Sequence, residues 1–177
     1  MSRASSLPLD WSRVFAVAFS SEEFRALCGR WTTGVTIVTA YHGESVHGMT
    51  VSAFTEVSLE PPLVLVCADR ASNTHRMIEQ GNAFAVNVLA RGQEGLSNKF
   101  ASKKDEWTRF DGLEVDLGST GAPILRGTVG AFDCRVVAAH DAGDHVIYVG
   151  RVEWLHLDPD IEPLLHQSSR YGVFCED

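Results

Sequence analysis

Gly48-Met-Thr-Val-Ser-Ala-Phe54 is the stretch that says most about the fold of this chain, and it continues through Glu56-Val-Ser-Leu-Glu-Pro-Pro-Leu-Val-Leu-Val66. Its first part consists of small and hydroxyl-bearing residues, which let a ligand approach the backbone closely. A Pro-Pro corner and an apolar strand follow. Such a surface suits a planar ligand that forms hydrogen bonds.

Length, composition and charge limit the possibilities around this stretch. The chain has 177 residues, of which 45% are hydrophobic, and this is enough for one well-buried core. We expect a single domain over residues 20–177, preceded by an N-terminal arm over residues 1–19. The net charge is −8 and the longest basic cluster is Lys103-Lys104. Nucleic acid is therefore not an expected partner.

The spacing of the cysteines and histidines argues against a metal site and against a disulfide framework. Four cysteines are widely separated, without a Cys-x-x-Cys pair, and seven histidines lack the His-x-x-x-His spacing of a helical metal site. The apolar run from Val14 to Phe19 is far shorter than the roughly 20 residues that span a bilayer. We expect a cytoplasmic protein with reduced thiols, no metal and no membrane segment.

Hydrophobic patterning predicts short strands with a few helices. Ser20 and Glu23 have the spacing of a capping box, and apolar residues follow at helical spacing up to Trp31. Helices are also predicted over 73–80 and 93–101. The predicted strands are 35–40, 46–57, 63–68, 84–89, 129–139 and 145–157.

The arrangement of these strands favours an all-β-dominated fold with peripheral helices. Residues 35–40 and 46–57 are expected to be antiparallel neighbours across a loop, and the last two strands to form a hairpin through Asp141-Ala-Gly-Asp144. Closure into a barrel removes exposed sheet edges. We therefore expect a closed or partly closed antiparallel barrel.

Common nucleotide-binding motifs are missing from the sequence. It has neither Gly-x-Gly-x-x-Gly between a strand and a helix nor a Walker A motif, so a parallel dinucleotide-binding fold is not expected. A helix N-terminus still attracts a phosphate, and Asn73 with Thr74 opens a predicted helix directly after a strand. Alternatively, Ser72-Asn73-Thr74 merely caps that helix.

Three motifs together resemble one family. With Thr33-Gly-Val-Thr-Ile-Val-Thr39 before it and Gly143-Asp-His145 after it, the opening stretch resembles the flavin-binding core of the short-chain flavin reductases. These enzymes are the NAD(P)H-using partners of two-component flavin monooxygenases. The resemblance covers roughly residues 20 to 172 and implies a six-stranded antiparallel Greek-key split β-barrel of the FMN-binding type. It also implies a homodimer with flavin near the subunit interface.

The resemblance implies that specific residues of this chain contact a flavin. The isoalloxazine and ribityl chain are expected to lie along Val46, His47, Gly48, Met49, Thr50, Ser52 and Ala53. The next strand borders the ring with Cys67, Ala68 and Asp69. Asn73 and Thr74 are expected to meet the phosphate, while Lys99 and Phe100 close the far side. A donor such as the Ser52 hydroxyl stabilises the negative charge of reduced flavin.

The resemblance also implies roles for His145 and Tyr171. His145 is expected to position the nicotinamide of NAD(P)H without acting as an acid or base, because hydride transfer requires contact and stacking. The alternative is that Gly143-Asp-His145 is only a hairpin turn. Tyr171 lies where relatives have an Arg-Tyr pair near the cofactor, although the residues before it depart from the usual His-x-Gly-x-Tyr pattern.

The favoured function is reduction of FMN or FAD by NADH or NADPH, with release of the reduced flavin to a separate monooxygenase. The alternative is a flavin-binding electron-transfer protein or corrinoid reductase that retains its FMN. A resemblance to the pyridoxamine-phosphate oxidases is weaker, because no basic phosphate cluster stands out. The sequence leaves the choices between FMN and FAD and between NADH and NADPH open.

Overall fold

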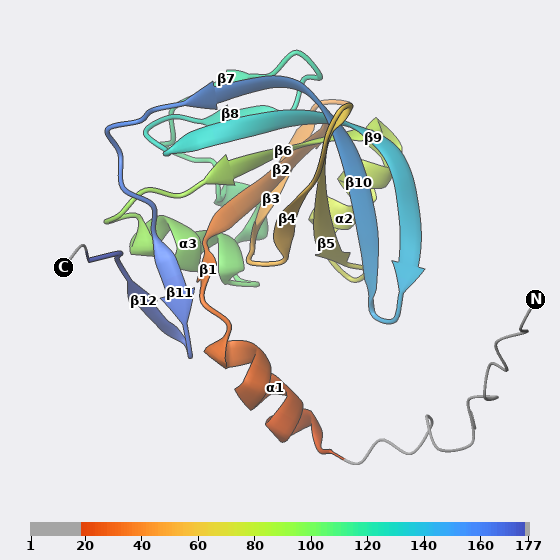
Figure 1. Ribbon diagram of the computed structural model, residues 1–177. Coiled ribbons are helices and arrows are strands. Elements are labelled where there is room, and N and C mark those ends of the chain that lie inside the picture. Colours follow the sequence, from red (N-terminus) through yellow and green to blue (C-terminus); the bar gives the residue numbers. More distant parts are fainter. Residues whose placement is uncertain (1–18, 176–177) are drawn as a thin grey trace, which may run out of the picture.

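A computed structural model of the protein describes residues 19–175 (Figure 1). The expected N-terminal arm therefore lies outside the described residues except for Phe19. Among residues 19–175, no helix is long and apolar enough to cross a lipid bilayer.

The principal sheet is antiparallel and has seven strands in the order β3-β2-β6-β9-β10-β5-β4. The edge strands β3 and β4 follow each other in the chain and are joined only by Ser52 and Ala53. The sheet must therefore curl until its two edges approach (Figure 1). The strands are β2 (Thr36–His42), β3 (Ser45–Val51), β4 (Phe54–Leu59), β5 (Pro62–Asp69), β6 (Ala83–Val88), β9 (Gly130–Ala142) and β10 (His145–Leu157).

The strand count corrects one prediction from the sequence. The segment 46–57, predicted as one extended strand, folds as β3 and β4 at opposite edges of the sheet. This break raises the six predicted strands to seven. The predicted pairing of 35–40 with 46–51 is confirmed, since Ile37 pairs with Thr50 and Thr39 with Gly48. The predicted hairpin is also confirmed, and Gly143 has a φ of 65° in its turn.

Two small sheets accompany the principal one. The first contains β1 (Thr33–Gly34), β11 (Leu165–Gln167) and β12 (Arg170–Gly172), and the second contains β7 (Val115–Leu117) and β8 (Pro123–Leu125). None of these five strands lies in a predicted helix or strand, because strands of two or three residues are too short to give a periodic pattern.

The three predicted helices are confirmed to within a few residues. They are α1 (Ser21–Arg30), α2 (Asn73–Gly81) and α3 (Glu94–Ala101). Ser20 and Glu23 form the complete capping box of α1, and the Ser72 hydroxyl accepts a hydrogen bond from the His75 N–H at the start of α2. Figure 1 shows α1 projecting away from the sheet, and none of its ten residues is buried.

The core fixes which side of β5 faces outward. Its residues alternate between buried and partly exposed, so Val64, Val66 and Ala68 point into the main hydrophobic cluster. α2 closes that cluster with Met77 and Ile78. The other face of β5, with Leu65, Cys67 and Asp69, is left for contacts outside the core.

Candidate functional site

The outer face of β5 adjoins residues from two other segments, β10 and the connection between β3 and β4. Asp69 pairs with His145, and Cys67 pairs with Ile147, across the antiparallel ladder to β10. Cys67 also donates its backbone N–H to the carbonyl of Ala53, in the connection between β3 and β4. The pairing therefore brings the predicted nicotinamide residue, His145, onto the sheet face that carries two predicted flavin contacts.

A cavity of about 570 Å³ lies over part of this face. It is mainly apolar, and its polar side chains come from the β3–β4 connection (Ser52) and from the strands β1, β4 and β11 (Thr33, Thr55 and His166). The lining residues include Trp31, Ser52, Ala53, Leu65, Cys67 and His166. Burial raises the pKa of the Cys67 thiol, so this side chain lines the cavity as a small neutral group.

A second cavity of about 290 Å³ lies between β3, the start of α2 and the end of α3. It contains most of the charged groups of the region. Its lining includes His47, Met49, Thr50, Asp69, Ala71, Ser72, Asn73, Phe100, Ala101, Lys103, Glu106 and Arg109. Asp69, at the end of β5, connects the two surfaces, because it shares the outer face of its strand with Cys67.

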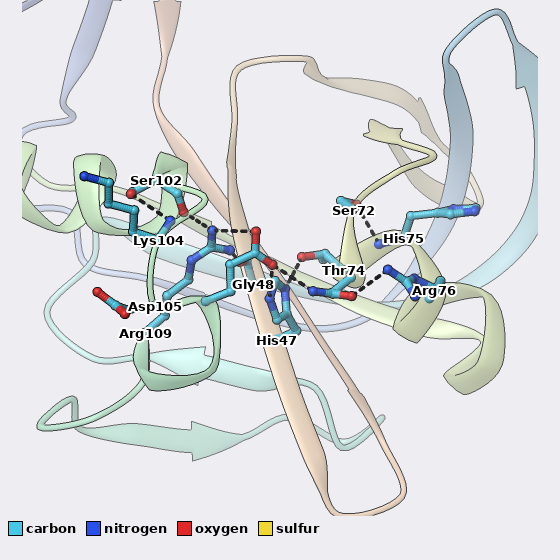
Figure 2. Close-up of polar contacts among 12 residues, drawn as sticks. His47, Gly48, Ser72, Thr74, His75, Arg76, Ser102, Lys104, Asp105 and Arg109 are labelled. Atoms are coloured by element: carbon cyan, nitrogen blue, oxygen red, sulfur yellow. Dashed lines mark hydrogen bonds and ion pairs between the residues drawn. The ribbon is translucent and has the colours of Figure 1, made fainter.

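A polar network holds this second cavity together (Figure 2). The Nδ1 atom of His47 lies 2.7 Å from the Thr74 hydroxyl oxygen, and its Nε2 lies 3.2 Å from the Glu106 carboxylate. Arg109 donates from Nη1 to the Gly48 carbonyl over 2.7 Å and from Nη2 to the Ser102 carbonyl. The network thus ties β3 and α2 to the segment that contains the short 3-10 turn η2 (Glu106–Thr108).

Burial sets the charge of this network. Burial and the positive charge of Arg109 lower the pKa of His47, so its imidazole favours the neutral form. Burial also lowers the pKa of Arg109, whose side chain is only 4% exposed, while Glu106 counteracts that change. Burial opposes ionisation of Glu106, but the hydrogen bond from Asn73 and the charge of Arg109 outweigh it and lower this pKa. Glu106 is therefore ionised at neutral pH.

The chain offers the groups that a flavin requires. β3 is an edge strand that pairs only with β2, so its outer N–H and C=O groups, apart from the Gly48 carbonyl that Arg109 engages, are available to a planar ligand. A Cβ atom at Gly48 would lie 2.8 Å from the Phe100 ring, so only glycine allows the backbone this close to the ring. The apolar cavity, the polar strand edge and the helix N-terminus at Asn73 together fit an isoalloxazine ring with a phosphate at one end.

The predicted site residues fall into several groups. Ser52, Ala53 and Cys67 line the first cavity, and His47, Met49, Thr50, Asp69, Asn73 and Phe100 line the second. Thr74 is fully buried against His47, and the side chain of Ala68 points into the core. Val46 and Gly48 are not among the residues that line either cavity. The Tyr171 hydroxyl bonds to Ser97 and Asn98 of α3 and lies outside both cavities.

The structure adds three residues that the sequence patterns do not reveal: Lys103, Glu106 and Arg109. Lys99, expected beside Phe100, instead donates from Nζ to the carbonyl of Asp111 and lines neither cavity. The basic residue facing the second cavity near the end of α3 is Lys103. The only sequence signal for these residues is the charge-rich segment after α3.

His145 is anchored within its hairpin. Its Nδ1 lies 2.7 Å from the Asp144 carboxylate, and its side chain is 43% exposed. The hydrogen bond to His145 lowers the pKa of Asp144. In a neutral imidazole, donation from Nδ1 leaves Nε2 as an acceptor, so the pair fixes both the ring orientation and its tautomer.

Comparisons with known proteins match this geometry. Residues 28–174 match the model of the flavin reductase like domain. The chain is 42% identical over 156 residues to FMN reductase (NADH) SmoA of Agrobacterium fabrum, covering 88% of this chain and 87% of that protein. It is 37% identical over 153 residues to HsaB of Mycobacterium tuberculosis, a flavin-dependent monooxygenase reductase subunit, covering 85% and 81%.

A solved structure gives the same result. The fold is similar to that of the NADH:FAD oxidoreductase SgcE6 of Streptomyces globisporus, solved in complex with NAD and FAD fragments. The TM-score is 0.82 at 36% sequence identity, covering 88% of this chain and 93% of that one. The family match spans both cavities and the His145 hairpin, and the chain belongs to the flavin reductase like domain family.

Proposed function

We propose that the protein is an NAD(P)H:flavin oxidoreductase that reduces FMN or FAD and releases the reduced flavin to a separate monooxygenase. One observation carries the proposal. His145, the residue assigned to the hydride donor, lies opposite Asp69 on the face that also presents Cys67. A nicotinamide and a flavin bound on one face meet without any movement of the sheet.

The bound flavin supplies the acceptor for two electrons, and the protein supplies alignment and charge stabilisation. The Ser52 hydroxyl and the outer N–H groups of β3 stabilise negative charge on the reduced ring. Leu65, Cys67 and Ala53 form an apolar floor that excludes water. The N-terminus of α2 and Asn73 receive the phosphate. His145, held by Asp144, orients the nicotinamide.

The proposal includes finer features of the fold and assembly. The curled seven-strand sheet with adjoining edges is consistent with a split barrel of the FMN-binding type. Homodimer formation, with flavin near the interface, would cover the exposed apolar side chains of α1. The four free cysteines are consistent with a reducing cytoplasm.

The separate partner is supported by the names of the relatives. HsaB is named as the reductase subunit of a flavin-dependent monooxygenase, which implies that a different chain acts as the oxygenase. The site itself also suits release, because the proposed flavin contacts are mainly backbone groups, hydroxyls and an amide. Arg109, the arginine that lines this cavity among the described residues, is already bonded to the Gly48 and Ser102 carbonyls.

An anaerobic stopped-flow experiment tests this function. The protein is mixed with NADH and excess free FMN or FAD, and reduction is followed by flavin absorbance. Reduction of many flavin equivalents per protein molecule supports a reductase. Reduction of only one bound equivalent, without exchange over minutes, would favour the electron-transfer alternative. Repeating the experiment with NADPH compares the two hydride donors.

A further inference from the structure

Asn73, the residue proposed to receive the flavin phosphate, is already engaged by a carboxylate. Its side-chain Nδ2 donates to Glu106 Oε2 over 2.8 Å, and its Oδ1 accepts from Arg76 over 2.7 Å. Glu106 also lines the second cavity. An anion that binds at the Asn73 amide therefore lies beside the Glu106 carboxylate and competes with it for this donor.

The same carboxylate neutralises the buried cation behind the cavity. Glu106 Oε1 lies 3.6 Å from Arg109 Nη2, and the two side chains are 22% and 4% exposed. The Nε atom of Arg109 is buried without a hydrogen-bond partner in the part of the chain that the structure describes. Such a group retains unused capacity for a negative partner, because a buried unpaired donor is costly.

The charges that line the cavity balance while Glu106 is ionised. Asp69 and Glu106 are negative, Lys103 and Arg109 are positive, and burial favours neutral His47. Arg76, which donates to Asn73 Oδ1, adds a further positive group beside the cavity, so ionised Glu106 offsets part of the local attraction for a phosphate. Removal of one negative charge at Glu106 gives the cavity a net positive charge, directly beside Asn73.

We propose that Glu106 is a specificity-determining residue that competes with the flavin phosphate for Asn73 and Arg109, and so keeps phosphorylated flavins exchangeable. The inference rests on the proposed function, since it concerns the same flavin site. Its chemical basis is that a carboxylate and a phosphate seek the same donors, and an ionised carboxylate also repels the phosphate. Riboflavin has the same ring and ribityl chain without the phosphate, so its affinity for the protein should not depend on Glu106.

The test compares FMN with riboflavin on protein freed of flavin. Glu106→Gln preserves the shape of the side chain and removes its charge. Calorimetric titration should show FMN binding at least fivefold more tightly to this variant than to the unchanged protein, while the riboflavin affinity changes less than twofold. The FMN gain should shrink as salt increases, because it is electrostatic.

Asp105→Asn provides the matched control. Asp105 is the adjacent residue, is exposed and lies outside the cavity lining, and its φ of 52° suits Asn as well as Asp. The control removes the same unit of charge and should change FMN affinity less than twofold. An equal increase in FMN affinity in both variants would show that the net charge of the protein causes the effect, and it would overturn the assignment to Glu106.

The unchanged protein provides a second measurement that does not depend on folding of a variant. If Glu106 competes with the phosphate, FMN binds less than about tenfold more tightly than riboflavin, a difference of about 1.4 kcal/mol. FMN binding more than 100-fold tighter than riboflavin overturns the inference, as does unchanged or weaker FMN binding by Glu106→Gln. If neither flavin binds, the proposed function itself fails, and this inference fails with it.

Discussion

His145 and Asp69 lie directly opposite each other in the antiparallel pair formed by β10 and β5. Directly opposite residues project from the same face of a sheet, with Cβ atoms roughly 5 Å apart. The ladder thus places His145, the residue proposed to position the nicotinamide, beside Asp69, which lines the charged cavity and shares its strand face with Cys67 of the apolar cavity. The ladder, rather than a mobile loop, sets the spacing between the two halves of the site.

His145→Ala should impair the use of NADH more than the binding of flavin. In the proposed site this side chain lies on the hydride donor's side, and its ring is oriented by Asp144. We expect the KM for NADH to rise at least fivefold or kcat to fall, while the flavin dissociation constant changes less than twofold. Steady-state kinetics and flavin titration measure the two effects separately.

His140→Ala is the matched control for this prediction. His140 is an exposed histidine on the same hairpin, in β9, and should leave both parameters unchanged. Normal NADH kinetics combined with lost flavin affinity in His145→Ala would reverse the assignment.

Gly48→Ala should weaken flavin binding and reduce stability. The added Cβ would lie 2.8 Å from Phe100 and 3.2 Å from the Thr39 methyl group, so β3 or the ring must shift. Overpacking of this kind costs about 1–3 kcal/mol. We expect FMN affinity to fall at least tenfold and the thermal midpoint to fall by several degrees. Gly34→Ala meets open space and should change neither quantity.

The protein should lose stability as the pH falls through the range in which an exposed histidine titrates. Burial holds the folded-state pKa of His47 below the ordinary value of 6.5. Below that pH the unfolded chain binds a proton that the folded protein does not, so the free energy of unfolding decreases. The loss is up to about 1.4 kcal/mol per pH unit until the folded-state pKa is reached.

His47→Gln removes this titration while keeping a polar group near Thr74. Urea unfolding at about pH 7.5 and about pH 5.5 should show a shallower decline for this variant than for the unchanged protein. His140→Gln removes an exposed histidine and should retain the original decline. Equal declines in all three proteins would show that His47 does not govern stability in this range.

The sequence predicts much of the scaffold and less of the site. The capping box at Ser20 and Glu23 locates α1, and continuous apolar runs locate the central strands, because periodicity and caps are local signals. The division of 46–57 into two strands depends on curling of the whole sheet, which no local pattern records. Glu106 and Arg109 lie in a segment predicted as loop, where side-chain positions follow from tertiary contacts alone.

The difference between Lys99 and Lys103 has the same origin. Both lie at or just after the end of α3 and have the same side chain, so sequence alone does not separate them. Lys99 lies in the last turn of α3 and points to the Asp111 carbonyl, whereas Lys103 lies beyond the helix end and faces the cavity. The direction of the chain after Ala101 determines which lysine faces the site.

The apolar stripe of α1 supports the prediction of a homodimer. Phe24, Leu27 and Trp31 share one side of the helix and are 56%, 74% and 77% exposed. A helix of ten residues is marginal without packing partners, so α1 requires a surface that this chain does not provide among its described residues. In the proposed homodimer, a second copy of the chain would provide that surface with closed symmetry.

Replacing Phe24 and Leu27, which line neither cavity, together with serine should therefore shift the protein from dimer toward monomer, since each side chain would contribute about 1.5–3 kcal/mol when buried. Size-exclusion chromatography with light scattering, run over a range of protein concentrations, measures the shift. Glu22→Ala changes the opposite side of the same helix and should leave the dimer intact. If flavin titration of the double variant shows weaker binding in proportion to the loss of dimer, the interface completes the flavin site. A monomer at every concentration of the unchanged protein would contradict the dimer and leave the exposed stripe of α1 for a different partner.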